Sequence, residues 1–295
     1  MIRIILFLLY FLFTELSQDS DSLTIVYTNN NNGNLVECDC ENRPWGGLAR
    51  RKTVIDGIRQ ENPNTFLFDS GDFLYQFGDL EDQDKMVIRL YEKTAYDAIT
   101  LGDNDVVNGS MFLNKYVLKS NLPLVSTTLA DKTGKLLLPP YMIKEKAGKR
   151  FAIIGYTPSS SFRFFPEGKE NPVSVKNEKS NLKKTLQDVK SKADYIILLS
   201  HSGDDVDVEL ARAFPEIDLI VGGHNQVETA EPIQVGKTLI VQAGGNGHMV
   251  GKMKVLLTKN KLTLVSNSLI SLGPDVNKEP LFKSLIETLK KPSEH

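Results

Sequence analysis

The chain has 295 residues, with 35 basic and 37 acidic side chains and a formal net charge of -2. Hydrophobic residues make up 41% of the chain and charged residues 24%, which excludes a disordered tail and a multi-span membrane protein. Two cysteines are too few for a disulfide-built miniprotein. Because binding to nucleic-acid phosphates requires a surplus of basic residues, we expect no nucleic-acid partner.

The first predicted element is an export signal. Residues Met1 to Phe13 contain one basic residue, Arg3, followed by an apolar run that is too short to span a bilayer comfortably. A clean small-x-small cleavage pattern is absent around Ser17 and Gln18, so an uncleaved membrane anchor remains the alternative. We therefore assign residues 1–20 to a signal peptide or anchor and residues 21–295 to a single domain. The expected location is periplasmic or secreted, with membrane contact only through a retained amino-terminal segment.

The rest of the chain alternates short β-branched runs with amphipathic stretches, which predicts an α/β fold. The predicted strands are 23–28, 65–69, 96–101, 151–156, 194–200, 217–223, 238–244 and 251–258. The predicted helices are 47–60, 84–93, 180–192 and 280–290. Crossover helices are expected between the earlier strands, whereas the last strands are predicted to follow one another without room for a helix. We expect a layered domain in which helices sandwich mixed β-sheets.

Polar and glycine-rich residues follow five of the predicted strands. These segments are Asn29 to Gly33, Asp69 to Asp72, Gly102 to Asp105, Ser200 to Gly203 and Gly222 to Gln226. Ligands of open α/β sheets bind at the carboxyl ends of strands, so these segments should converge on one pocket.

Two histidines in these segments indicate the chemistry. His201 and His224, combined with Asp72 and Asp103, form a typical ligand set for a divalent metal. The alternative interpretation of each histidine is a side chain that is simply hydrogen-bonded within a turn.

Six segments, in this order, resemble the calcineurin-like metallophosphoesterases, and within them the exported 5′-nucleotidase and UDP-sugar hydrolase branch. The family motifs T-N-D-x-H-G, G-G-x-A-R, D-x-G-D, D-A-x-x-L-G-N-H-E, S-H-x-G and G-G-H-x-H correspond to residues 28–33, 46–50, 69–72, 97–105, 200–203 and 222–226. The likeness extends from about Leu23 to Leu257 and implies the layered fold of that family. Its separate carboxy-terminal substrate domain has no counterpart among the residues after Leu257.

The departures from the family pattern fall on one metal site. The resemblance implies that the first metal would be held at the positions of Asn30, Asn32, Asp72 and Gln226, where three of the four family ligands are replaced by amides. It implies a second metal at Asp72, Asp103, His201 and His224, and this set is intact. Because an amide offers only a neutral carbonyl oxygen, we expect the first site to be degenerate and the protein to bind one divalent metal, Mn, Zn or Fe.

The catalytic residue is not identified by the sequence. The family histidine that assists the leaving group corresponds to Asn104, which cannot act as a general acid near neutral pH. Asp105 is a possible substitute only if its pKa is raised enough to keep it protonated.

Two further features lie outside the metal motifs. Cys38 and Cys40 are possible accessory thiols that could supply the donors missing from the first site; the alternatives are a local disulfide or unrelated thiols. Gly46 and Gly47 precede a predicted helix that contains Arg50, which could receive a phosphate at the helix amino end, although such glycines more often serve packing.

Three functions remain open from the sequence. The leading hypothesis is a metal-dependent phosphoester hydrolase of the 5′-nucleotidase type with an altered, one-metal site, acting on a phosphorylated small molecule such as a nucleotide. The alternative is a catalytically inactive binding protein that keeps the phosphoesterase fold. Thiol chemistry at Cys38 and Cys40 is the third.

Overall fold

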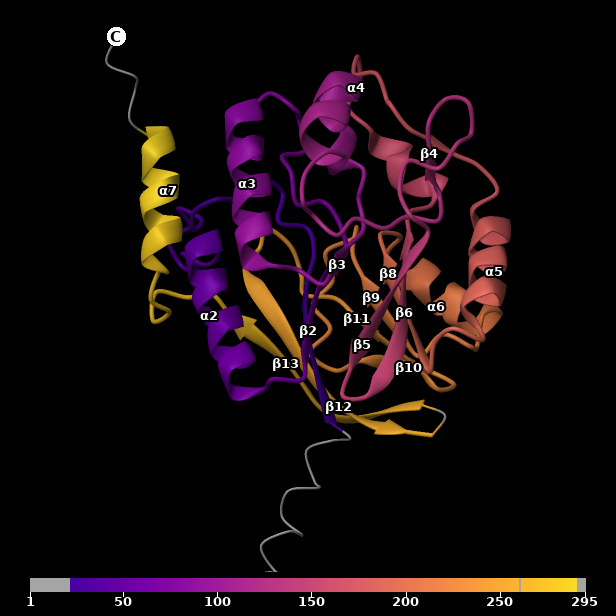
Figure 1. The fold of residues 1–295 in the computed structure, drawn as a ribbon. Coiled ribbons are helices and arrows are strands. Elements are labelled where there is room, and N and C mark those ends of the chain that lie inside the picture. The colour runs from indigo at the N-terminus through magenta and orange to yellow at the C-terminus, as the bar shows by residue number, and fades with distance from the viewer. Residues whose placement is uncertain (1–21, 260, 291–295) are drawn as a thin grey trace, which may run out of the picture.

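The computed structural model describes residues 22–259 and 261–290. The predicted export segment therefore lies outside the described residues. Within the described ranges, no helix has the length and apolar character needed to cross a membrane. Two large mixed β-sheets form the centre of the molecule, and helices cover the outer face of each (Figure 1).

The first sheet contains the amino-terminal strands. Its order is β13-β12-β1-β2-β3, in which β1, β2 and β3 are parallel and β12 and β13 are antiparallel to their neighbours. The strands are β1 (Ser22–Thr28), β2 (Thr65–Asp69), β3 (Ala98–Ile99), β12 (Met249–Thr258) and β13 (Lys261–Ser271). Strands from opposite ends of the chain therefore lie side by side.

The second sheet has the order β10-β11-β9-β8-β6-β5, with a parallel centre and antiparallel strands at both edges. Its strands are β5 (Tyr141–Lys146), β6 (Lys149–Tyr156), β8 (Tyr195–Ser200), β9 (Leu219–Gly222), β10 (Ile233–Val235) and β11 (Thr238–Val241). A separate two-stranded sheet pairs β4 (Leu129–Ala130) with β7 (Ser174–Val175).

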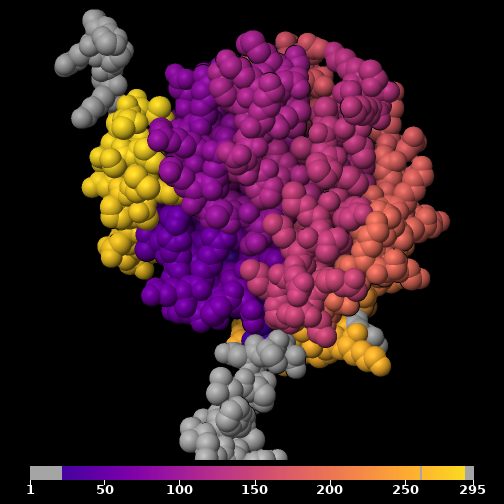
Figure 2. Space-filling view, in the orientation of Figure 1, coloured from indigo at the N-terminus to yellow at the C-terminus, as the bar shows by residue number. Residues whose placement is uncertain are grey.

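Side-chain alternation along the strands creates three apolar layers. In β1, Ile25 and Tyr27 face the second sheet, whereas Val26 points to the opposite face. The helices that cover the two outer faces are α2 (Leu48–Glu61), α3 (Glu81–Thr94), α4 (Gly109–Phe112), α5 (Glu178–Val189), α6 (Asp204–Ala213) and α7 (Pro280–Lys290). The carboxy-terminal α7, yellow in Figure 2, packs on the flank formed by α2 and α3.

The predicted fold class, mixed β-sheets sandwiched by helices, is confirmed. The predicted helices α2, α3, α5 and α7 are present with ends shifted by at most a few residues, and α7 spans the predicted residues. The prediction that no helix separates the last strands is wrong, because α6 connects β8 to β9. Three aspartates in the first turn of α6 complement the positive end of the helix dipole and are the sequence signal for this helix.

A buried aspartate on α3 links two loops near the carboxyl ends of the strands. Asp84 Oδ1 accepts a hydrogen bond from the Tyr75 backbone N–H at 2.9 Å, and Asp84 Oδ2 accepts one from Asn108 Nδ2 at 2.7 Å. Burial raises the pKa of Asp84 to about 6. The folded protein therefore keeps a proton here that the unfolded chain releases near pH 4.

This raised pKa predicts a specific pH dependence. Between about pH 4 and pH 6 the folded state binds more protons at Asp84, so its contribution to the free energy of unfolding should fall as the pH rises, by up to about 3 kcal/mol. Urea unfolding of Asp84→Asn at pH 4 and pH 7 should show that this component has disappeared. The exposed Asp82→Asn on the same helix is the control and should keep the wild-type pH dependence; an unchanged profile for Asp84→Asn would contradict the assignment.

Candidate metal centre

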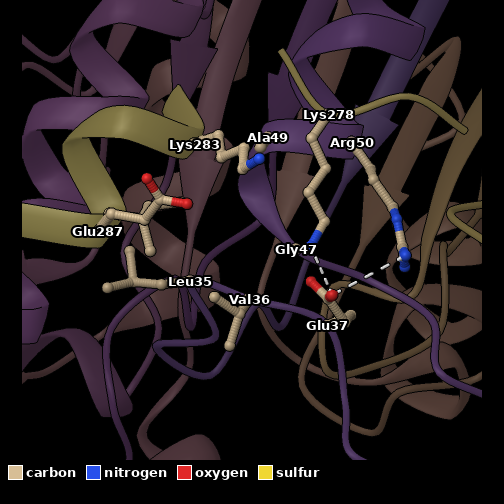
Figure 3. A pocket seen from close by; sticks show the side chains of 10 residues that line it. Leu35, Val36, Glu37, Gly47, Ala49, Arg50, Lys278, Lys283 and Glu287 are labelled. Atoms are coloured by element: carbon tan, nitrogen blue, oxygen red, sulfur yellow. Dashed lines mark hydrogen bonds and ion pairs between the residues drawn. The ribbon is translucent and has the colours of Figure 1, made fainter. Parts of the chain in front are cut away.

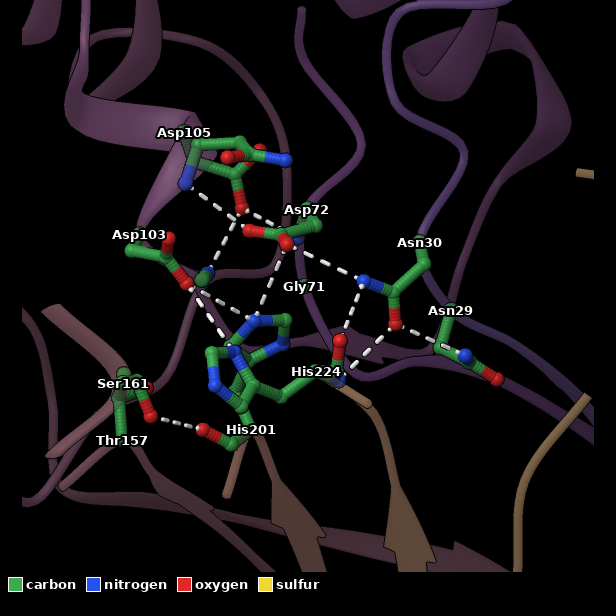
Figure 4. Close-up of polar contacts among 12 residues, drawn as sticks. Asn29, Asn30, Gly71, Asp72, Asp103, Asp105, Thr157, Ser161, His201 and His224 are labelled. Carbon is green, nitrogen blue, oxygen red and sulfur yellow. Dashed lines mark hydrogen bonds and ion pairs between the residues drawn. The ribbon is translucent and has the colours of Figure 1, made fainter. Parts of the chain in front are cut away.

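Four polar side chains meet where strands of both large sheets end (Figure 4). Asp72 and Asp103 follow β2 and β3 of the first sheet, and His201 and His224 follow β8 and β9 of the second. One nitrogen or oxygen atom from each lies within 4.8 Å of those of the other three. The structure thus brings together all four residues expected to bind a metal.

The distances suit a small cation at the centre of the cluster. His201 Nε2 lies 3.2 Å from Asp72 Oδ2 and 3.3 Å from Asp103 Oδ1, and His224 Nδ1 lies 3.3 Å from the same Asp103 oxygen. Ligand atoms about 2.0–2.1 Å from a tetrahedral ion are separated by about 3.3–3.4 Å. These three separations match that value, and the remaining donor pairs lie within 4.8 Å of each other.

The orientation of His201 provides a separate test of the fit. Its Nδ1 lies 2.6 Å from the Ser70 carbonyl oxygen, which can only accept, so Nδ1 carries a proton. In the neutral ring, Nε2 then directs a lone pair at two carboxylates. Both Nε2 and Asp103 Oδ1 are buried without a properly directed hydrogen bond, and a cation between them would satisfy both atoms.

The electrostatics of the cluster favour a positive charge at this place. Burial alone would lower the pKa of His201, but the carboxylates of Asp72 and Asp103 outweigh burial and raise that pKa well above its ordinary value. For Asp103, burial acts to raise the pKa, and interactions with His201 and His224 reverse the effect and hold it below its usual range. The two carboxylates therefore favour a positive charge next to His201 Nε2.

Tight turns place these side chains. Asp72 and His224 have left-handed backbone angles, with φ of 59° and 79°. Gly71, at φ 91°, lies so close to the next loop that a Cβ there would come within 2.5 Å of the Gly102 nitrogen and 2.9 Å of His201 Nδ1. Such conformations are costly for most residues and concentrate at functional sites.

Asn30, which was expected at the first metal site, donates an amide N–H to the four-residue cluster. Asn30 Oδ1 accepts hydrogen bonds from the His224 backbone N–H and from Asn29 Nδ2, both at 2.9 Å. These bonds fix the amide orientation, so Asn30 Nδ2 donates to Asp72 Oδ2 at 3.1 Å. A cation on this side of Asp72 would meet an N–H group instead of an oxygen.

Further amide side chains lie near Asn104, which follows Asp103. Asn104 Nδ2 donates to Asn32 Oδ1 at 3.2 Å, and Asn32 Nδ2 donates to Asn246 Oδ1 at 3.0 Å. Gln226 is exposed and its amide covers Gly245. Asn104, Asn32 and Asn246 thus form a hydrogen-bonded row of neutral amides. Asn246 was not among the residues predicted from the sequence, because it follows none of the five polar strand ends.

Asp105 is not placed as a substitute acid. Its Oδ2 accepts hydrogen bonds from the backbone N–H groups of Asp72 and Gly102, and its Oδ1 accepts one from Leu74. Burial, followed by the charge of Asp72, does raise its pKa well above the ordinary value. The side chain nevertheless faces the backbone, so we assign it to holding the loops after β2 and β3 together.

Of the interpretations left open for Cys38 and Cys40, the structure shows the local disulfide, and the two residues are not free accessory thiols. Cys38 and Cys40 form a disulfide with each other. A disulfide offers no thiolate, so the pair as it stands cannot replace the donors lost at Asn30 and Asn32. The loop that carries it is held by a hydrogen bond from the Cys38 backbone N–H to the Trp45 carbonyl.

Comparison with known proteins agrees with this geometry. The family model for calcineurin-like phosphoesterases matches residues 39–228, more than half of the chain. A 5′-nucleotidase of Vibrio cholerae is 31% identical over 288 residues, which cover 84% of this chain and 51% of that protein. The chain spans about half the length of the curated relatives it matches.

Solved structures show the same fold. The sulfate thiohydrolase SoxB of Thermus thermophilus, solved with glycerol, has a TM-score of 0.80 at 18% identity, covering 90% of this chain and 60% of that one. A 5′-nucleotidase precursor of Thermus thermophilus has a TM-score of 0.76 at 24% identity, covering 90% and 58%. With the family match and the sequence relative, these findings establish that the chain belongs to the calcineurin-like phosphoesterase family.

Proposed function

We propose that this protein is a metal-dependent phosphoester hydrolase of the 5′-nucleotidase type that holds one divalent ion. The ligands are Asp72, Asp103, His201 and His224. The observation that carries the proposal is the unpartnered, buried Nε2 of His201, which faces two carboxylates from a ring whose other nitrogen is held by Ser70.

The amide row supports a single ion. Asn30 directs an N–H group at Asp72, and Asn32 and Gln226 offer at most neutral oxygens. The family ligand pattern therefore survives on the histidine side of Asp72 and is lost on the other.

The chain's own residues have definable roles around that ion. A divalent ion at this place would supply Lewis-acid polarisation of a phosphoester oxygen. The Ser70 carbonyl keeps His201 in the tautomer that presents Nε2 to the cluster. The backbone N–H of Asn104 donates to Asp72 Oδ1 at 2.9 Å, while Asn30 holds Oδ2, so the Asp72 carboxylate is fixed from both sides.

The position of Asn104 shapes the expected substrates. Its amide can donate a hydrogen bond to a leaving oxygen but cannot transfer a proton near neutral pH. Phosphate esters with good leaving groups, such as p-nitrophenyl phosphate, should therefore be cleaved more readily than nucleoside monophosphates. We place the protein outside the cytoplasm on the basis of residues 1–13, with phosphorylated small molecules as its partners.

Metal analysis and an activity screen test the proposal together. Purified protein incubated with Mn²⁺, Zn²⁺ or Fe²⁺ and then dialysed should retain one equivalent per chain, and Asp72→Ala should abolish both retention and turnover. Asp79→Ala, a change at an exposed aspartate in the same loop between β2 and α3, is the matched control. Retention of two equivalents, or of none with all three metals, would contradict the proposal.

A binding protein without catalytic activity is the second candidate. It is favoured by Asn104, which removes the family's leaving-group histidine, and by the three amides at the first site. This candidate predicts one bound metal and ligand binding without turnover, even toward p-nitrophenyl phosphate. The screen therefore separates the two candidates.

A further inference from the structure

A second pocket lies at the amino end of α2, on the side that faces α7 (Figure 3). Its volume is about 80 Å³, the space of two or three water molecules at about 30 Å³ each. It is lined by the loop before α2, by the first turn of α2, by Lys278 and by α7. None of the four candidate metal ligands contributes to it.

The start of α2 is a positive helix end that its own sequence leaves uncompensated. The residue before the helix is Gly47, at φ 91°, which has no side chain to cap it. The first turn contains no acidic residue. Of the orphan N–H groups there, Leu48 donates to the Leu35 carbonyl at 3.0 Å. The remaining N–H groups and the helix dipole favour an anion.

Arg50 extends this positive end along the pocket wall. Its side chain is only 8% exposed. Nη1 donates to the Pro44 carbonyl at 2.7 Å, and Nη2 lies 3.9 Å from Glu37 Oε1. Its Nε is buried without a hydrogen-bond partner among the described residues. A buried, charged N–H group without an acceptor is costly and is satisfied by an oxygen ligand.

Two lysines add to the basic lining of the pocket, which also contains two carboxylates. Lys278 and Lys283 line the pocket with Arg50, against the carboxylates of Glu37 and Glu287. Glu37 Oε1 lies 2.5 Å from Lys278 Nζ. Burial acts to raise the pKa of Glu37, but Lys278 outweighs burial and lowers it, so the group is a carboxylate. Figure 3 shows it between the two cations.

We propose that this pocket is a binding site for a small oxyanion, with phosphate as the expected class of ligand, and that Glu37 is a tethered carboxylate that competes for it. When Glu37 turns out toward solvent, three cationic side chains and a helix amino end remain against the single carboxylate of Glu287. Nη1 of Arg50 is held by the Pro44 and Leu272 carbonyls, so Nε and Nη2 are the pair of donors left for the oxygens of phosphate. The site is separate from the candidate metal centre.

Phosphate titration of metal-free protein tests this site independently of the proposed function. Chelator-treated protein at constant ionic strength is titrated with inorganic phosphate by calorimetry. Glu37→Gln should bind phosphate about tenfold more tightly than the wild type because the competing charge is gone, which corresponds to ~1.4 kcal/mol. Lys283→Gln, a change at an exposed residue, should weaken binding several-fold. Lys190→Gln, on an exposed lysine outside the pocket, should leave it unchanged.

Opposite outcomes would overturn the assignment. Absence of phosphate binding in both the wild type and Glu37→Gln would exclude the site. An equal loss of phosphate affinity in Lys190→Gln and Lys283→Gln would exclude it as well. Loss of phosphate binding in Asp103→Ala would move the ligand to the candidate metal centre. Because no metal is present in the titration, failure of the one-metal proposal leaves this result unaffected.

Discussion

The triple variant Asn30→Asp, Asn32→His, Gln226→His should retain two divalent ions per chain, where the unaltered protein should retain one. These changes restore the family ligands on the amide side of Asp72. Asn30 now donates to Asp72 Oδ2, whereas an aspartate there offers only acceptors and adds a negative charge. Two nearby ions can stabilise both the attacking and the leaving oxygen, so we expect turnover of p-nitrophenyl phosphate to rise about a hundredfold.

The matched control for this gain is Asn246→Asp. Asn246 belongs to the same amide row but does not correspond to a family ligand, so it adds charge at the site without restoring coordination. Elemental analysis after dialysis should show one equivalent for this control and two for the triple variant. A single equivalent in the triple variant, or two in the wild type, would show that the amides do not determine the metal count.

Substitution of Asp103 should separate loss of a ligand from loss of charge. Asp103→Ala removes the oxygen that lies 3.3 Å from both histidines, and it should lower metal affinity at least about a hundredfold and abolish turnover. Asp103→Asn keeps a neutral oxygen at the position where the family has asparagine. It should retain one ion with affinity reduced about tenfold.

Metal-dependent thermal stabilisation provides the measurement. A metal ion that binds only the folded state raises its stability by an amount that grows with the ratio of metal concentration to Kd. Measuring Tm at increasing concentrations of Mn²⁺ or Zn²⁺ therefore ranks the metal affinities of the variants. The predicted order is wild type, Asp103→Asn, Asp103→Ala, and circular dichroism of the metal-free variants checks that each is folded. Equal stabilisation of wild type and Asp103→Ala would remove Asp103 from the ligand set.

The sequence predicted the convergence of the four candidate ligands better than it predicted the edges of the fold. The four candidate ligands follow strongly apolar strands, and the rule that polar residues at such strand ends converge placed them together. The missed β5 and β13 lie at sheet edges and are only partly buried, so they lack the continuous apolar runs of the central strands. Strand β3 is only two residues long, although six were predicted.

Contacts between separate loops were beyond sequence reasoning. The direction of Asp105 depends on the meeting of the loops after β2 and β3, and the tautomer of His201 depends on the backbone oxygen of Ser70. Every residue has a backbone carbonyl, so the residue type at position 70 does not indicate that this carbonyl accepts a hydrogen bond from His201. The orientation of Asn30 likewise follows only from its partners Asn29 and His224.

The division of the four candidate ligands between the two sheets has a thermodynamic consequence. An ion shared by Asp72 and Asp103 from one sheet and by His201 and His224 from the other would cross-link the layers at one end of their common apolar interior. Separation of the layers and release of the ion are then linked equilibria. Chelation should accordingly speed amide hydrogen exchange along β2 and β8, far beyond the loops that hold the ion.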